Sequence, residues 1–255
     1  MALLEVDNIS VRFGGIVALD GLSFTIEAGS ICALIGPNGA GKTTLFNVVS
    51  RVYEPSAGHL RFSGLDLLEL PPHQIPRAGV TRTFQNLALF PGLSVVENVM
   101  VGAHSHSKGG FAASPFRFPP VPSQEKELRA EAMAYLGQMH LAHLANRPCA
   151  GLPYGTMKRI ELARAMASHP KLLMLDEPAS GLTHSEVDEL AGLIGALKDT
   201  HELSILLVEH HMAMVMSISE KVVVMDFGRK IAEGTPAEVQ SNPAVIEAYL
   251  GTPLT

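Results

Sequence analysis

A candidate phosphate-binding loop is the most chemically informative feature of this chain. Residues 36–44 read Gly-Pro-Asn-Gly-Ala-Gly-Lys-Thr-Thr, between an apolar run at 31–35 and a helix-competent run at 45–49. Its glycines free the backbone to curl, so that successive N–H groups can point at one anion. Lys42, at the start of the helix, would reach the β- and γ-phosphates, and the Thr43 hydroxyl would bind Mg²⁺. A turn that merely needs small residues is the other interpretation, and the full Gly-x-x-x-x-Gly-Lys-Ser/Thr pattern in this context disfavours it.

Two adjacent carboxylates follow a short apolar strand in the second half of the chain. Residues 171–178 read Lys-Leu-Leu-Met-Leu-Asp-Glu-Pro. Strand ends in open α/β sheets present ligand-binding groups, so Asp176 would hold Mg²⁺ through its water shell and Glu177 would polarise an attacking water. The alternative is a helix N-terminus that favours negative charge. The phosphate loop elsewhere in the chain makes a nucleotide-hydrolysing pair the better interpretation.

Histidine and glutamine side chains could complete such a site. His210 follows the apolar run 205–208 and could donate a hydrogen bond to a γ-phosphate or hold a catalytic water and carboxylate. His211 could play the same part, and spacing does not decide between them. Gln85 ends a β-like piece, where its amide could contact the metal and report nucleotide state; taken alone, an exposed glutamine carries no meaning.

A second helix start could also attract an anion. Residues 152–166 read Leu-Pro-Tyr-Gly-Thr-Met-Lys-Arg-Ile-Glu-Leu-Ala-Arg-Ala-Met, which predicts a helix beginning at Gly155. Ile160, Ala163 and Ala167 repeat at helical spacing, and Pro170 is expected to end the helix. Its N-terminus resembles the phosphate-loop helix in its dipole but has no lysine at the corresponding place.

The elements that must position these residues suggest a layered α/β fold. Half-exposed antiparallel strands are expected at 3–9 and 22–26, and a further β piece at 59–62. Continuously apolar strands, as in a buried parallel sheet, are expected at 31–35, 172–175, 205–208 and 222–225. Helical stretches such as 185–198 separate the later strands, which is the spacing of βαβ units.

The middle of the chain, residues 86–168, reads almost wholly as helix and loop and predicts an inserted helical unit. Ser94 is expected to cap a helix through Met100, and Ser123 to precede a helix over 125–144. Within this unit, residues 104–124 are rich in Gly, Ser and Pro and are expected to form a mobile surface loop.

A docking segment is the sharper hypothesis for that loop, because three phenylalanines are costly to leave in water. These are Phe111, Phe116 and Phe118. His104 and His106 lack further clustered metal ligands, so metal binding there is disfavoured.

Composition limits the class of protein. The net charge of −6 on 255 residues offers no basic stripe for nucleic acid. Two cysteines indicate no disulfide framework and suit a reducing cytosol. Acidic residues interrupt the first segment, so no signal peptide is expected, and no apolar run approaches the roughly 20 residues of a membrane span. If the protein works at a membrane, we expect it to do so through membrane-spanning partners.

Taken together, the motifs resemble the nucleotide-binding subunit of an ABC transporter. They occur in family order over most of the chain: the Walker A loop at 36–44, Gln85 of the Q-loop, the signature position at 152–156, the Walker B strand at 172–177, the D-loop at 180–183 and the switch His210. The resemblance implies a P-loop NTPase (RecA-like) α/β core at 1–85 and 169–255, with an antiparallel β subdomain and an inserted α-helical subdomain at 86–168.

The resemblance also implies the site. ATP and Mg²⁺ are the expected cofactors, with Glu177, His210 and Lys42 catalytic and Thr43, Gln85 and Asp176 at the metal. The ATP-binding residues would be Phe13, Gly36, Pro37, Asn38, Gly39, Ala40, Gly41, Lys42, Thr43 and Thr44. Phe13 would stack on adenine, with strand packing as its other interpretation. In this family two subunits form a head-to-tail sandwich, and the signature helix of each binds the γ-phosphate held by the other.

A narrower likeness is to the ATPase subunits of branched-chain amino acid importers. It rests on Arg-Thr-Phe-Gln-Asn-Leu-Ala-Leu-Phe-Pro at 82–91, Tyr154-Gly155, and the stretches 231–239 and 246–251. The implied partners are a second ATPase subunit, two membrane permeases and, indirectly, a solute-binding protein, with the chain peripheral on the cytoplasmic face of the inner membrane. Related ATPases serve urea, amide or lipopolysaccharide transport. The competing class is a soluble ABC ATPase acting on DNA or ribosomes, but those carry a long coiled-coil insertion or two cassettes.

The sequence departs from the family at the signature. The common Leu-Ser-Gly-Gly-Gln stands as Leu-Pro-Tyr-Gly-Thr, so the trans contact would be made by Pro153, Tyr154, Gly155 and Thr156. Pro153 supplies neither a hydroxyl nor an N–H where the family offers phosphate contacts. Thr183 stands where the family usually has Asp.

Overall fold

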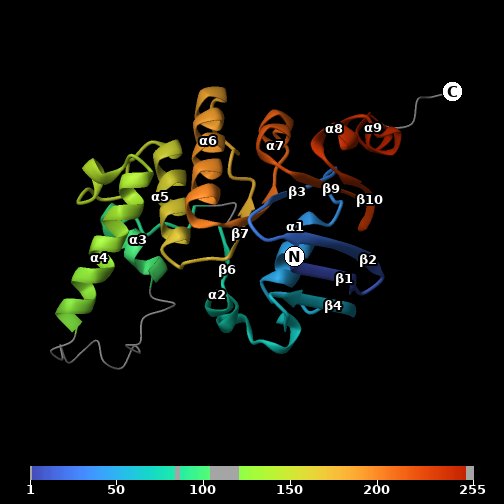
Figure 1. The fold of residues 1–255 in the computed structure, drawn as a ribbon, viewed down its shortest axis with the longest axis horizontal. Coiled ribbons are helices and arrows are strands. Elements are labelled where there is room, and N and C mark those ends of the chain that lie inside the picture. The colour runs from blue at the N-terminus through green and yellow to red at the C-terminus, as the bar shows by residue number, and fades with distance from the viewer. Residues whose placement is uncertain (1, 84–86, 104–120, 251–255) are drawn as a thin grey trace.

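A computed structural model describes residues 2–83, 87–103 and 121–250 of the chain. Gln85 and residues 104–120 lie outside the described residues, and with them the predicted Q-loop contact and the proposed docking segment. The described part contains two sheets with helices packed between and around them (Figure 1).

The larger sheet has six strands in the order β10-β9-β3-β8-β7-β6. All neighbours pair in parallel except β9 and β10, which form an antiparallel hairpin. The strands are β3 (Ile31–Ile35), β6 (Val80–Arg82), β7 (Leu172–Asp176), β8 (Ser204–Val208), β9 (Lys221–Asp226) and β10 (Arg229–Gly234). Every residue of β3, β7 and β8 is buried, which explains their continuously apolar runs and confirms the predicted parallel sheet.

The smaller sheet is antiparallel, in the order β2-β1-β4-β5, as the half-exposed strands predicted. Its strands are β1 (Ala2–Phe13), β2 (Ile16–Glu27), β4 (Ala57–Phe62) and β5 (Leu65–Asp66). Short 3₁₀ turns η1 (Leu67–Glu69) and η2 (Pro72–Gln74) and helix α2 (Ile75–Ala78) lead from β5 into β6. Strands β1 and β2 are both longer than predicted, because bulges let them continue past polar residues in their middles.

Helix α1 (Lys42–Val49) lies between the two sheets and buries Leu45, Phe46, Val48 and Val49 (Figure 1). Side chains on β3, β7 and β8 alternate between two layers: Cys32 and Leu34 face the α1 layer, whereas Leu173 and Leu175 face helix α6 (His184–His201) and the helical unit. Burial on both faces fixes the register of these strands, because a slip of one residue would exchange the two layers. The carboxyl ends of β3, β7 and β8 are thereby held at one edge of the sheet.

The middle of the chain is helical, as predicted, with α3 (Val95–Ala103), α4 (Val121–Gln138), η4 (Ala142–Leu144) and α5 (Tyr154–Met166). Figure 1 shows these elements beyond α6, on the side away from the antiparallel sheet. Ser94 caps α3 as expected: its Oγ accepts from the Glu97 N–H at 3.4 Å, and the Glu97 carboxylate accepts from the Ser94 N–H at 2.7 Å.

Four predicted helix boundaries in this unit are wrong. Helix α3 runs past Met100 to Ala103. Helix α4 begins at Val121, so Ser123 lies inside it, and it ends at Gln138 because His140 takes a left-handed conformation (φ 59°) and the Leu141 N–H turns back to the Leu136 carbonyl. Helix α5 ends at Met166, before Pro170 is reached.

Helices α7 (Met212–Ile218), α8 (Pro236–Gln240) and α9 (Pro243–Leu250) complete the chain near β9 and β10. They cover a third apolar cluster that contains Val215, Val222, Val224 and Val239. Burial raises the pKa of Tyr249 on α9, and a hydrogen bond with the backbone of Gly36 opposes that shift, which places α9 beside the phosphate loop. In the parts of the chain that the structure describes, no helix combines the length and apolar character needed to cross a membrane.

Candidate functional site

The loop between β3 and α1 has a backbone that only glycine allows at two places. A Cβ at Gly36 would lie 2.1 Å from the Met225 carbonyl oxygen. Gly41 has a φ of 100°, and a Cβ there would lie 2.7 Å from the Ala18 carbonyl oxygen. Glycine is therefore required both by close approach of neighbouring strands and by conformation. Helix α1 starts directly after Gly41 with no acidic residue in its first turn, so nothing of its own charge competes for an anion there.

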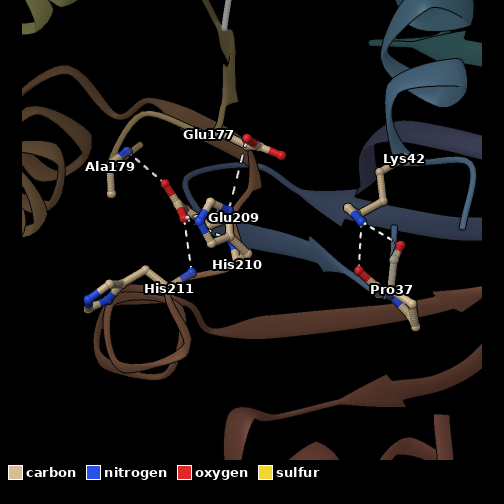
Figure 2. Close-up of polar contacts among 8 residues, drawn as sticks. Pro37, Lys42, Glu177, Ala179, Glu209, His210 and His211 are labelled. Carbon is tan, nitrogen blue, oxygen red and sulfur yellow. Dashed lines mark hydrogen bonds and ion pairs between the residues drawn. The ribbon is translucent and has the colours of Figure 1, made fainter. Parts of the chain in front are cut away.

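The side chain of Lys42 folds back onto the loop that precedes α1. Its Nζ donates to the Gly36 carbonyl at 2.6 Å and to the Pro37 carbonyl at 3.0 Å (Figure 2). Burial lowers the pKa of Lys42, and the negative charges of Glu177 and Asp176 oppose that shift. The ammonium group thus sits among carbonyl oxygens in the curl of the loop, where an incoming phosphate would offer it a stronger, charged acceptor.

The rest of the loop is open to solvent where the predicted contacts need it to be. Asn38 and Thr43 are exposed, Thr44 is half-buried, and Ala40 is buried as a packing residue. Phe13 ends β1 with 45% of its surface exposed and meets the Tyr53 ring edge-on, with centroids 5.1 Å apart. An exposed aromatic face is what adenine stacking needs, although Phe13 also packs against its neighbour.

Asp176 ends β7 and forms a buried ion pair that the sequence analysis did not anticipate. Its Oδ2 lies 2.7 Å from Nη2 of Arg82, the last residue of β6, and the two side chains are 6% and 12% exposed. Arg82 also donates to Asn47 Oδ1 at 2.7 Å and lies 5.3 Å over the Phe46 ring, both on α1. A charged residue at the end of a short strand was the available signal. Its partner depends on β6 pairing with β7, which only the fold shows.

Glu177 and His210 come together at the ends of neighbouring strands. The Glu177 N–H donates to the Val208 carbonyl at 2.8 Å, and Glu177 has a left-handed φ of 49°. His210 Nδ1 lies 3.9 Å from Glu177 Oε2, and the His210 side chain is 69% exposed (Figure 2). Non-glycine residues in this conformation cluster at functional sites because the surroundings must hold them there.

The structure decides which of the two histidines lies at the site. His211 is the N-cap residue of α7, where its Nδ1 accepts from the Met214 N–H at 3.4 Å. Its ring packs edge-on against His184, with centroids 5.6 Å apart. His210 therefore lies between two carboxylates, with its Nδ1 3.9 Å from both Glu177 Oε2 and Glu209 Oε2, and His211 supports a helix.

A buried carboxylate was also missed by the sequence analysis. Glu209, at 1% exposure, accepts hydrogen bonds from the backbone of Ala179, His210 and His211 (Figure 2). Its signal was a lone acidic residue directly after an apolar strand.

The signature position forms the start of α5, as predicted, with Pro153 as the N-cap residue. Pro153 and Tyr154 are exposed, whereas Thr156 is buried at 9%. A Cβ at Gly155 would lie 2.6 Å from Glu186 Oε1, so this glycine permits the approach of α6.

Thr183 has a structural role at the D-loop position. With Glu186 it forms the capping box of α6. Its side chain bonds the Glu186 backbone, and the Glu186 carboxylate lies 2.9 Å from the Thr183 N–H.

The residues predicted for the metal suit Mg²⁺ by their chemistry. Thr43 offers a hydroxyl and Asp176 a carboxylate, the hard oxygen donors that Mg²⁺ prefers. No group of three or more His, Cys, Asp or Glu side chains is arranged for a metal within residues 2–83, 87–103 and 121–250.

Comparisons with known proteins agree with the motifs. A family model described as ABC transporter matches residues 19–180, and one described as branched-chain amino acid ATP-binding cassette transporter matches residues 229–254. The chain is 44% identical over 249 residues to the high-affinity branched-chain amino acid transport ATP-binding protein BraF of Pseudomonas aeruginosa, covering 98% of each. It is 42% identical to LivG of Salmonella typhimurium, a protein of the same description, with the same coverage.

Solved structures show the same architecture. A nucleotide-free ATP-binding cassette from an ABC transporter matches with a TM-score of 0.86 and 30% identity, over 99% of this chain and 100% of that one. The ADP conformation of an ATP-binding cassette of an ABC transporter matches with the same score, identity and coverage.

Proposed function

Since this chain belongs to the ABC transporter family of ATP-binding proteins, we propose that it is the ATP-hydrolysing subunit of an importer of branched-chain amino acids. The observation that carries the proposal is similarity from end to end: relatives described as branched-chain amino acid transport ATP-binding proteins match 98% of the chain, and the chain matches 98% of them. The residues of the site described above supply the chemistry that such a subunit needs.

Each part of the site has a proposed role in ATP hydrolysis. The loop from Gly36 to Thr44 holds the phosphates through backbone N–H groups and Lys42, and Phe13 stacks on adenine. Thr43, Asp176 and Gln85 would hold Mg²⁺, which would supply positive charge to offset the negative charge of the phosphates. Glu177 then orients and polarises the attacking water.

His210, 3.9 Å from Glu177, steadies that carboxylate or the γ-phosphate. Its neighbour His211 takes no part, because its ring nitrogen caps α7.

A second ATPase subunit, either another copy or a paralogue, is proposed to complete the site. Figure 1 shows α5 separated from α1 by α6 and β7, so the signature position of this chain is remote from its own phosphate loop. In the proposed dimer the exposed residues Pro153 and Tyr154, with Gly155, face the γ-phosphate bound to the partner. Pro153 can donate no hydrogen bond, which leaves the N–H groups of the following residues for this contact.

The membrane permeases are proposed to dock in a groove between β6 and the helical unit. The groove has a volume of about 400 Å³ and is lined in part by Thr81, Arg82, Phe90, Val101 and Arg164. Phe90 is 50% and Val101 36% exposed, so apolar surface is available to a partner. The proposed division into a core at 1–85 and 169–255 and a helical subdomain at 86–168 places this groove at their junction, and the chain would be peripheral on the cytoplasmic side of the membrane.

A Glu177→Gln variant tests the catalytic role. We expect it to bind ATP normally and to lose about 10²–10⁴-fold in kcat, the contribution typical of general-base catalysis. Glu202→Gln is the matched control, because Glu202 shares a left-handed φ of 50° and is the C-cap residue of α6, away from the candidate site. Steady-state ATPase assays and nucleotide titrations measure both variants. Near-normal turnover in Glu177→Gln would remove Glu177 from the role.

Purification from native membranes tests the transport assignment. A tagged chain is expected to copurify with integral membrane proteins and a second ATPase, because in the proposed complex the permeases carry the solute across the membrane. Recovery of nucleic acid or ribosomes in place of membrane proteins would contradict it and favour a soluble ABC ATPase.

A further inference from the structure

Glu209 joins the two loops that carry the proposed catalytic side chains. Its Oε1 accepts from the Ala179 N–H at 2.7 Å, in the loop that follows β7. Its Oε2 accepts from the His210 N–H at 2.9 Å and the His211 N–H at 3.0 Å, in the loop that follows β8. Figure 2 shows this carboxylate lying between the two loops, with Glu177 and His210 above and beside it.

The bridge is buried and charged, so it should be stiff. The side chain of Glu209 is 0% exposed, which makes its desolvation costly unless every oxygen is well bonded. Hydrogen bonds from backbone N–H groups to a carboxylate are about twice as strong as neutral ones. Displacing either loop would break at least one of these bonds inside a water-excluded site, and each loop is therefore tied to the position of the other.

The bridge lies where the side chains of Glu177 and His210 must be held in fixed positions relative to each other. Glu177 is two residues before Ala179, and His210 directly follows Glu209. A backbone bond from the Glu177 N–H to the Val208 carbonyl, at 2.8 Å, continues the pairing of β7 and β8 beyond Asp176, and past it the two segments run as irregular loops. The 3.9 Å approach of His210 Nδ1 to Glu177 Oε2 is thus made by two side chains on irregular loops, and such loops need an added constraint.

We propose that Glu209 is a positioning residue for ATP hydrolysis, which sets the geometry of Glu177 and His210 by bridging the loops that carry them. The inference rests on the proposed function, because it gives Glu209 a role only through those two residues. Glu209 itself would touch neither the nucleotide nor the attacking water. The alternative is a purely structural carboxylate that satisfies buried N–H groups and affects stability alone.

Glu209→Gln separates the two roles. A glutamine keeps the size of the side chain but has one acceptor oxygen, so its NH₂ group must face the N–H donors of one loop. We expect kcat to fall about 10–100-fold, the scale of loss that follows a small misplacement of catalytic groups, with the Kd for ATP within about twofold of wild type. Hydrogen exchange by mass spectrometry should show faster exchange at Ala179 or at His210 and His211.

Glu220→Gln is the matched control. Glu220 also binds a backbone N–H through its carboxylate, that of Ile31 at 2.6 Å, and pairs with Lys198 at 2.7 Å. It lies at the opposite end of β3 from the phosphate loop, so its loss should lower the midpoint of thermal unfolding and leave kcat unchanged. An equal loss of kcat in both variants would mean that Glu209 acts through stability, and would overturn the inference.

The turnover of a double mutant distinguishes a positioning role for Glu209 from a purely structural one. If Glu209 acts through Glu177, then Glu209→Gln should cost little further turnover in a Glu177→Gln background, because residues that act as a unit are not additive. If kcat of the double mutant instead falls by the product of the two single-variant fold-losses, the proposal is contradicted. Glu209→Asp, which keeps the charge but shortens the reach, should retain an intermediate kcat, and serves as the test variant if Glu209→Gln does not fold.

Failure of the inference is distinguishable from failure of the proposed function. If the wild-type chain does not hydrolyse ATP, or if Glu177→Gln keeps its turnover, the proposed function is wrong. If the wild type hydrolyses ATP and Glu177→Gln does not, but Glu209→Gln or Glu209→Asp keeps wild-type kcat, only the positioning role of Glu209 is overturned.

Discussion

The ion pair between Arg82 and Asp176 tests how burial determines the contribution of an ion pair to folding stability. Both partners are almost inaccessible, at 12% and 6% exposure, and their atoms are 2.7 Å apart. Replacing Arg82 by methionine keeps most of the apolar stem against Phe46 but removes the guanidinium. Asp176 would then be a buried carboxylate without its cation.

The expected cost follows from that burial. Breaking a buried ion pair by removing one partner costs about 3–5 kcal/mol, mostly because the remaining charge is left uncompensated. For a chain of this size each kcal/mol corresponds to about 2–4 °C in the unfolding midpoint, so Arg82→Met should unfold roughly 6–20 °C below the wild type. Asp176→Asn in the same background should recover part of the loss, since it removes the stranded charge.

Arg229→Met is the matched control. Arg229 pairs with Asp20 at a similar distance, 2.5 Å, but the two side chains are 71% and 35% exposed. Exposed pairs contribute about 0–1 kcal/mol, so this variant should lose at most about 4 °C. Circular dichroism during heating, without nucleotide and at one salt concentration, measures all of these variants. If Arg82→Met loses no more than Arg229→Met, the reasoning from burial is refuted.

Three other predictions concern the loop, a buried thiol and the histidine pair. Gly41→Ala should weaken ATP binding at least about tenfold in a fluorescent-nucleotide titration, because its Cβ would lie 2.7 Å from a backbone oxygen of β2. Gly39 has a φ of 84° and open space around its Cβ position, so Gly39→Ala should cost only the conformational strain of about 1–2 kcal/mol. Equal losses of ATP affinity in the two variants would mean that close approach does not matter. Burial raises the pKa of Cys32 from 9.0 to about 12, so above about pH 9 the folded chain keeps a proton that the unfolded chain releases. The difference in unfolding free energy between wild type and Cys32→Ala, measured in urea, should therefore shrink by about 1.4 kcal/mol per pH unit above about pH 9. A difference that stays constant with pH would show that this thiol does not titrate as inferred. His210→Ala should lower kcat at least about tenfold with little effect on the unfolding free energy. His211→Ala should lower the unfolding free energy by about 1 kcal/mol, because α7 loses its cap, and should keep kcat. The reverse pattern would refute this assignment of the two histidines.

Local patterns predicted those parts of the protein that depend on neighbouring residues. The strand at 31–35 and the helix starting at Lys42 have the predicted bounds, because a fully apolar strand, three glycines and a helix-forming run specify them locally. Strand β10 went unpredicted because Arg229, Lys230 and Glu233 give it the polar, irregular pattern of an edge strand. The end of α4 was also missed, since His140 adopts a left-handed conformation that only a few per cent of non-glycine residues take.

By itself, the sequence was sufficient for the family, and it predicted a set of candidate site residues, Lys42, Asp176, Glu177 and a strand-end histidine, from residue type, spacing and the apolar runs before them. Only the tertiary structure decided which groups act on one another. It turned His210 toward Glu177 and His211 onto a helix, paired Arg82 with Asp176 across two strands, and set Glu209 between two loops. The physical reason is that these contacts join residues about 30–90 positions apart, or depend on how one loop leaves its strand, and both are settled by strand order and burial rather than by local propensity.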